Sequence, residues 1–135
     1  MTTKEKQLLL QDLCARLPYG VICRFTDTFD GCEVDNVLHP DDITDMFRHR
    51  RIDIKPYLRL MSSMTLEELH ECQEILGTGV EIQDGFIRII DSSIKRFTYL
   101  EIDAVFAFLN KKMFDIRELI PKGLALEALE GMYNI

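Results

Sequence analysis

The sequence lacks the patterns that usually identify an enzyme class or a membrane protein. It contains no nucleophile elbow, no glycine-rich phosphate loop and no His-Glu-x-x-His pattern. No stretch approaches the roughly 18 apolar residues that a membrane span requires. Met1–Lys6 is followed only by the short apolar run Leu8–Leu10, which does not predict a signal peptide. We therefore expect a cytoplasmic protein without a membrane partner, and no enzyme class is indicated.

Cysteine is present at four positions, but without the spacing of a metal site. Cys14, Cys23, Cys32 and Cys72 include no C-x-x-C pair and show no close pairing with histidine. Zinc sites usually show such spacing. The pattern instead predicts small buried apolar side chains in a reducing cytoplasm. We expect no metal and no other cofactor.

Positive charge is also scarce, because 16 Lys and Arg residues stand against 23 Asp and Glu residues, for a formal net charge of -7. This average field repels a phosphate polyanion, so we expect no general nucleic-acid binding. With 135 residues and 47% hydrophobic content, the chain can bury a sizeable core. We interpret it as a single globular domain spanning residues 1–135.

The clearest structural signal is a helix over Met64–Leu76. Thr65 and Glu68 have the spacing of a capping box, and Met64 and Leu69 that of a hydrophobic staple. Apolar residues at helical spacing also predict helices over Thr3–Leu17, with Arg16 on its polar side, and after the cap residue Thr98. A third capping box predicts a short C-terminal helix after Asp115.

The dipeptide Asp30-Gly31 predicts a tight hairpin between Val21–Phe29 and Cys32–His39. A two-residue loop would pair Phe25 with Asn36. In this register one face gathers the apolar residues and the other the polar ones, which supports the pairing. The apolar set is Val21, Cys23, Phe25, Phe29, Cys32, Val34 and Leu38.

A second hairpin is predicted at Asp84-Gly85, where Ile82 would oppose Ile87 and Val80 would oppose Ile89. Ile52–Met61 reads as one more strand, at a sheet edge or ending near its proline at position 56. The predicted fold class is therefore α+β, with two antiparallel β-hairpins and an additional strand packed with three main helices and a short C-terminal helix.

The one basic run in the sequence contains Arg48, Arg50 and Arg51. These arginines are the candidate binding residues, and three interpretations of the run stay open. Nearby carboxylates could neutralise the run, it could bind an acidic protein partner, or it could contact nucleic acid. The nearby carboxylates belong to Asp41, Asp42 and Asp45. The first interpretation is preferred and the last is the least favoured.

His39 lies close in sequence to Asp41 and Asp42. A histidine with carboxylates could bind a metal or move protons. The simpler interpretation is a polar loop with an aspartate that caps a helix, and we prefer it. No catalytic residue and no metal ligand is therefore assigned.

Three stretches carry a resemblance to other proteins. They are Leu17-Pro18-Tyr19-Gly20, Lys55-Pro56-Tyr57-Leu58-Arg59 through Ser62-Ser63-Met64-Thr65, and Phe114-Asp115 through Gly123-Leu124-Ala125. In these stretches the sequence resembles a group of short uncharacterised proteins of gut anaerobic bacteria, often encoded in phage-like or mobile regions. The resemblance implies a bacterial cytoplasmic setting and a mobile-element origin, and it supplies no activity, cofactor or site residue.

The leading functional hypothesis is a small non-enzymatic protein-interaction module, which would bind a protein partner or self-associate. The alternative is a nucleic-acid-associated accessory protein that uses the basic run at Arg48–Arg51. The third hypothesis is an enzyme with a site at His39, Asp41 and Asp42.

Overall fold

The computed structural model describes residues 1–76, 80–83, 86–89 and 99–133. The chain divides into two compact units, a sheet unit of Met1–Leu58 with Arg117–Ile135 and a helix-pair unit of Arg59–Ile116. Both units combine helices with strands, which confirms the α+β class. The expectation of one domain spanning residues 1–135 stays a prediction.

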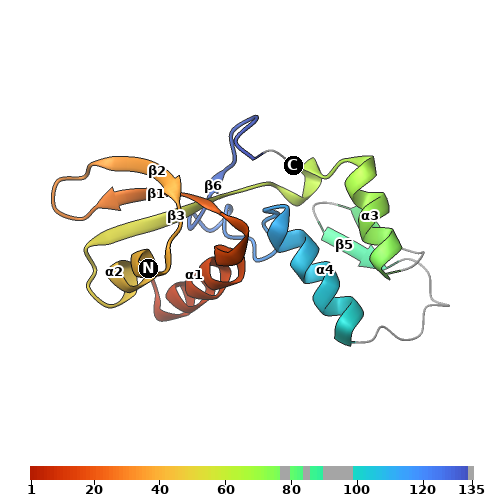
Figure 1. Cartoon of the computed structure of the whole chain (residues 1–135), viewed down its shortest axis with the longest axis horizontal. Coiled ribbons are helices and arrows are strands. Elements are labelled where there is room, and N and C mark those ends of the chain that lie inside the picture. Colours follow the sequence, from red (N-terminus) through yellow and green to blue (C-terminus); the bar gives the residue numbers. More distant parts are fainter. Residues whose placement is uncertain (77–79, 84–85, 90–98, 134–135) are drawn as a thin grey trace. The chain divides into compact units, whose positions relative to one another are not determined.

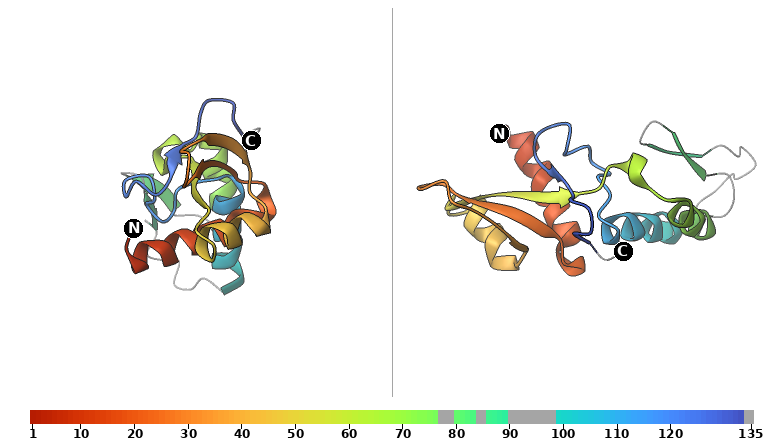
Figure 2. Two further views of the ribbon diagram at one scale, coloured as in Figure 1. Left: turned by 90° about the vertical axis from the view of Figure 1, so that its left-hand side faces the viewer. Right: turned by 90° about the horizontal axis from the view of Figure 1, so that it is seen from above.

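A four-stranded sheet in the order β2-β1-β3-β6 forms the centre of the sheet unit. Its strands are β1 (Ile22–Asp27), β2 (Glu33–Val37), β3 (Ile52–Leu58) and β6 (Leu126–Glu127). β1 is antiparallel to β2 and β3, whereas β6 runs parallel to β3. The helices α1 (Thr3–Arg16) and α2 (Pro40–Phe47) lie on one face of this sheet (Figures 1 and 2). Buried side chains of α1 and β3 contribute to the core: Leu9, Leu13 and Ile54.

The C-terminal tail is held against the same sheet. After β6, the Tyr133 hydroxyl accepts a hydrogen bond from the Ile22 N–H at 2.9 Å and donates one to the Tyr57 carbonyl at 2.8 Å. Burial raises the pKa of Tyr133, so this hydroxyl stays protonated and keeps its donor. The tail therefore joins β1 to β3 through one phenol group.

The first hairpin forms, but the predicted two-residue loop is wrong. The Asp27 N–H donates to the Cys32 carbonyl at 2.9 Å, so residues 28–31 make a longer loop. The Asp27 carboxylate accepts from the N–H groups of Phe29 and Asp30, at 2.7 and 3.1 Å. Such local side-chain bonds give the backbone an alternative to a tighter turn.

The longer loop shifts the pairing by two residues, so Phe25 pairs with Val34 and not with Asn36. A shift of two residues keeps every side chain on its predicted face. The prediction that Phe29, Cys32 and Val34 join the core is nevertheless wrong, because all three are exposed. The loop end of the hairpin extends past α2 (Figure 1), and Phe29 in this loop is exposed.

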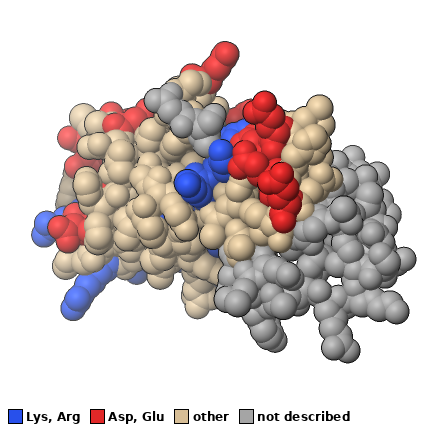
Figure 3. Space-filling view, turned by 45° about the vertical axis from the view of Figure 1, so that its right-hand side comes forward, with Lys and Arg blue, Asp and Glu red and all other residues tan. Residues whose placement is uncertain are grey.

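In the helix-pair unit, α3 (Leu66–Leu76) packs with α4 (Tyr99–Lys111). The capping box of α3 is confirmed, since the Thr65 hydroxyl accepts from the Glu68 N–H at 3.2 Å and the Glu68 carboxylate accepts from the Thr65 N–H at 3.1 Å. The buried cluster of this unit consists of Met61, Cys72, Val105, Leu109 and Phe114. The solvent-facing side of α3 is strongly acidic (Figure 3), with exposed Glu67, Glu71 and Glu74.

The second hairpin has the predicted register. In β4 (Val80–Gln83) and β5 (Phe86–Ile89), Val80 pairs with Ile89 and Ile82 with Ile87. The Asp84-Gly85 turn and the predicted cap at Thr98 lie outside the described residues.

The predicted short C-terminal helix does not form, and residues 115–123 make a series of turns. Phe114 forms a parallel bridge with Arg59, and the Asp115 N–H donates to the Arg59 carbonyl at 2.8 Å. Glu118 adopts a left-handed φ of 57°, which a right-handed helix does not contain. The φ of Glu118 is therefore incompatible with the predicted helix after Asp115.

Candidate functional site

The outer edge of β2 is an exposed edge of the four-stranded sheet. All five residues of β2 are exposed, and they include apolar side chains, with Val34 at 61% and Val37 at 40% exposure. Phe29, in the adjoining loop, is 93% exposed. Proteins usually protect a free sheet edge with lysine, proline or a covering segment. β2 contains neither Lys nor Pro, and no described strand pairs with its outer edge.

The pairing of β2 with β1 determines which backbone groups face outward. The Leu38 N–H donates to the Val21 carbonyl at 2.9 Å, so this pair is a hydrogen-bonded one. Hydrogen-bonded and non-hydrogen-bonded pairs alternate along an antiparallel ladder. Glu33, Asp35 and Val37 therefore direct their N–H and C=O groups away from β1. These groups form an unused ladder that another strand could extend.

The acidic side chains of β2 are oriented by its neighbours in the sheet. Arg24 contacts Asp35 at 3.2 Å and Glu33 at 3.7 Å, and its guanidinium lies 5.6 Å from the centre of the Tyr57 ring. The Tyr57 hydroxyl donates to the Asp35 carboxylate at 3.0 Å. Burial, with the Asp35 hydrogen bond as the second cause, raises the pKa of Tyr57. The sheet side of Asp35 is therefore occupied, and its backbone stays available at the edge.

One feature of the β2 sequence indicates an exposed edge. In Glu-Val-Asp-Asn-Val the two valines are three positions apart, so they fall on opposite faces of the strand. A half-buried strand would repeat its apolar residues every two positions. The predicted apolar face of the hairpin, which groups Val34 with the buried residues of β1, does not reveal this exposed edge.

The three arginines of the basic run are all exposed. No ion pair joins them to Asp41, Asp42 or Asp45 among the described residues, so the preferred neutralisation does not take the form of direct pairs. The Thr28 hydroxyl lies 3.1 Å from the Arg50 carbonyl and 3.0 Å from the Arg51 carbonyl. This contact holds the basic run beside the hairpin loop. Binding at these arginines stays a prediction.

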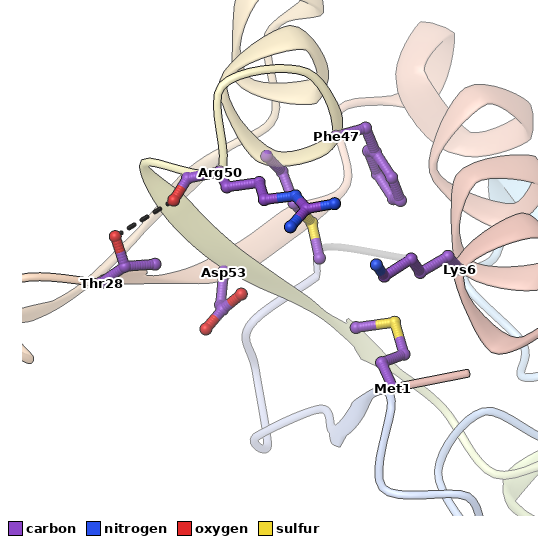
Figure 4. Close-up of a pocket in the computed structure, with 7 residues that line it drawn as sticks. Met1, Lys6, Thr28, Phe47, Arg50 and Asp53 are labelled. Carbon is purple, nitrogen blue, oxygen red and sulfur yellow. Dashed lines mark hydrogen bonds between the residues drawn. The ribbon is translucent and has the colours of Figure 1, made fainter. Parts of the chain in front are cut away.

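A pocket of about 260 Å³ lies next to the basic run. It is lined by Met1, Lys6, Thr28, Met46, Phe47, Arg50 and Asp53. Figure 4 shows the Arg50 guanidinium and the Lys6 amine approaching the same space from α2's end and from α1. Of the residues predicted to bind, only Arg50 lines this pocket. Met46, Phe47 and Asp53 lie within four positions of Arg50, whereas Met1, Lys6 and Thr28 are far from it in sequence. Sequence spacing alone could not bring this second group to the pocket.

The residues of the third hypothesis lie at the start of α2. His39 is exposed and precedes the helix, and its N–H donates to the Asp42 carboxylate at 2.8 Å. This is the helix-capping arrangement that we preferred. In the described part of the chain, no three His, Cys, Asp or Glu residues are grouped so that they could hold a metal ion.

The four cysteines are free thiols and divide into two classes. Cys23 and Cys72 are buried as predicted, and burial raises the pKa of both thiols. Cys14 and Cys32 are exposed, so the prediction of burial is wrong for these two. Cys14 lies on the solvent side of α1, and Cys32 follows the longer hairpin loop.

Searches against known protein families, curated proteins and solved structures find no match. Among the helices that the structure describes, none has both the length and the apolar character needed to cross a membrane. Function must therefore be argued from the geometry of the sheet edge, the basic run and the pocket.

Proposed function

We propose that the protein is a small non-enzymatic interaction module that binds an extended segment of a partner protein along the outer edge of β2. The observation that carries this proposal is that all five β2 residues are exposed at a sheet edge. Asn36 accepts from the Val37 N–H at 2.8 Å, which leaves Glu33 and Asp35 as outward donors with no partner among the described residues. An added strand would satisfy them, while Val34 and Val37 would contact its side chains.

Charge favours a partner with basic residues over a second copy of this chain. β2 carries Glu33 and Asp35 and has no basic residue. Two copies that pair around Asp35 would place carboxylates directly opposite each other, which destabilises a ladder. A partner strand with Lys or Arg between β-branched residues would meet opposite charges instead. We therefore expect a monomer that binds a basic extended peptide.

A proline substitution can test this edge without removing its bonds to β1. Glu33 is the first residue of β2 and its N–H points outward, so Glu33→Pro removes an outward donor at a position where proline is tolerated. Glu33→Ala is the matched control, since it removes the same side chain and keeps the N–H. Peptides selected from a randomised display library against the wild-type protein supply the probe, and fluorescence anisotropy measures their affinity.

We expect Glu33→Ala to retain affinity within about threefold and Glu33→Pro to lose about tenfold or more, because a lost hydrogen bond and a steric block act together. Hydrogen exchange of the wild-type protein provides a test that does not depend on the variants. Peptide binding should slow exchange at Glu33 and Asp35. Equal affinity of the two variants, unchanged exchange, or failure to select any binding peptide would contradict the proposal.

The cellular setting is also a proposal. Two exposed free thiols, those of Cys14 and Cys32, fit a reducing compartment such as the cytoplasm. The resemblance to bacterial proteins of mobile regions supports the same setting. The nucleic-acid alternative rests on the exposed arginines at positions 48, 50 and 51.

A further inference from the structure

We propose that the pocket between α1, α2 and β3 binds a carboxylate carried on a short apolar stem. The pocket shares no residue with the outer edge of β2. The proposal therefore stands or falls independently of the proposed strand addition.

The charges that line the pocket favour a monoanion. Among the lining side chains, Lys6 and Arg50 contribute two cations and Asp53 contributes one carboxylate, which leaves a net side-chain charge of +1. No ion pair joins these three residues to each other or to other described residues. A single carboxylate would balance the net charge, whereas Asp53 would repel a doubly charged phosphate. An arginine also binds a carboxylate in a two-point geometry that suits its planar fork.

The remaining lining residues favour an apolar stem. Met46 is buried and Phe47 is half-buried, and together with Met1 they provide apolar surface beside the two cations. Figure 4 shows Phe47, Met1, Lys6 and Arg50 around one common space. The volume of about 260 Å³ lies below the range of roughly 300–1,000 Å³ that is typical of pockets for larger ligands. It therefore suits a small acid or one acidic side chain.

The backbone holds Arg50 in an unusual conformation that directs it to the pocket. Its φ of 53° lies in the left-handed region, which non-glycine residues seldom adopt. The Thr28 hydroxyl contacts the Arg50 and Arg51 carbonyls, and the Arg51 N–H donates to the Asp45 carbonyl at 2.9 Å. Strained residues held by their surroundings often occur at ligand sites. The backbone that carries Arg50 is thus held in place before a ligand arrives, which lowers the entropic cost of ordering this segment.

The test is a titration of the isotope-labelled protein with hexanoate, followed by amide chemical shifts. The neutral analogue hexanamide and inorganic phosphate serve as ligand controls. Arg50→Gln and Lys6→Gln each remove one cation from the pocket. Arg51→Gln is the matched control, because Arg51 is exposed in the same basic run and does not line the pocket.

We expect hexanoate to shift the amides around the pocket, with a dissociation constant that rises at least about fivefold in Arg50→Gln and in Lys6→Gln and stays within about twofold in Arg51→Gln. Hexanamide and phosphate should bind more weakly than hexanoate. A blocked peptide with one glutamate then distinguishes the source of the carboxylate, because tighter binding than hexanoate indicates a protein side chain and weaker binding a free acid. Absent shifts, or equal effects of all three variants, would overturn the proposal.

Discussion

Asp12 lies fully buried between two arginines in the sheet unit. Its carboxylate contacts Arg16, one turn later in α1, at 2.9 Å, and Arg117 of the C-terminal segment at 2.7 Å. Arg16 is itself fully buried, so its predicted place on the polar side of α1 is wrong. Helical spacing identifies an apolar face, but it cannot reveal that an arginine 105 positions away will share the same carboxylate. Long-range pairing of this kind is the part of the core that local patterns miss.

Replacing Asp12 should therefore destabilise the fold. In Asp12→Ala, both arginines lose their shared carboxylate while they stay in or near the core, and breaking such a buried pair typically costs about 3–5 kcal/mol. Urea denaturation monitored by circular dichroism measures the free energy of unfolding. Asp41→Ala, at an exposed position in the first turn of α2, should cost less than about 1 kcal/mol. A loss at Asp12 no larger than at Asp41 would contradict the structural role of this cluster.

Elements whose signals are local could be predicted, and elements that depend on distant contacts could not. The start of α3 follows from Thr65 and Glu68, which satisfy each other's backbone groups within one turn. The register of β4 and β5 follows from facing apolar residues and a short loop. The first hairpin differs, because the Asp27 carboxylate stabilises a longer loop that the Asp-Gly pattern does not indicate.

The candidate binding features also divide into those with a local signal and those that depend on distant contacts. The exposure of the basic run can be predicted from its charge, because a run of arginines is costly to bury. The pocket combines Lys6 of α1, Arg50 of the basic run and Asp53 of β3, so it exists only once the sheet has formed. The edge position of β2 depends on the strand order, which a hairpin pattern does not specify.

The start of α3 also makes stability depend on pH. Arg59 donates two hydrogen bonds to Glu68, at 2.7 and 2.8 Å, and its guanidinium lies 4.3 Å from the centre of the Phe114 ring. Burial acts to raise the pKa of Glu68, but the hydrogen bonds from Arg59 and Thr65 outweigh it, and the pKa is lowered overall. A lowered pKa in the folded state means that the pair stabilises the fold above the unfolded-state pKa of about 4.3. This stability is lost as the pH falls through the lower folded-state value.

We therefore expect wild-type stability to fall between about pH 5 and the lower folded-state pKa, and Glu68→Gln to show a shallower fall. The midpoint of urea denaturation as a function of pH measures this effect. Glu71→Gln, which changes an exposed carboxylate on the same helix, is the control and should keep the wild-type profile. If the urea midpoints of wild type and Glu68→Gln fall in parallel with decreasing pH, this ion pair does not control the loss of stability in acid.

On the scale of the whole molecule, charge favours the protein-partner hypothesis over the nucleic-acid hypothesis. The formal net charge of -7 opposes a polyanion, and it favours a partner that carries basic residues. The exposed carboxylates of β2 and α3 are negative, like the net charge of the whole chain. The basic run is a local exception, and one of its three arginines, Arg50, lines the pocket.

We accordingly expect no appreciable affinity for duplex DNA at physiological salt. Each phosphate contact contributes through the release of counterions, and the three exposed arginines at positions 48, 50 and 51 can supply about three such contacts at most. Proteins that bind duplexes well usually make about six to ten, and the acidic background weakens the few that form here. A gel-shift titration at increasing salt measures this affinity. A salt-sensitive shift that disappears in an Arg48/Arg50/Arg51→Ala variant would establish a nucleic-acid role for the basic run, because the substitution removes its charge while β2 keeps its sequence.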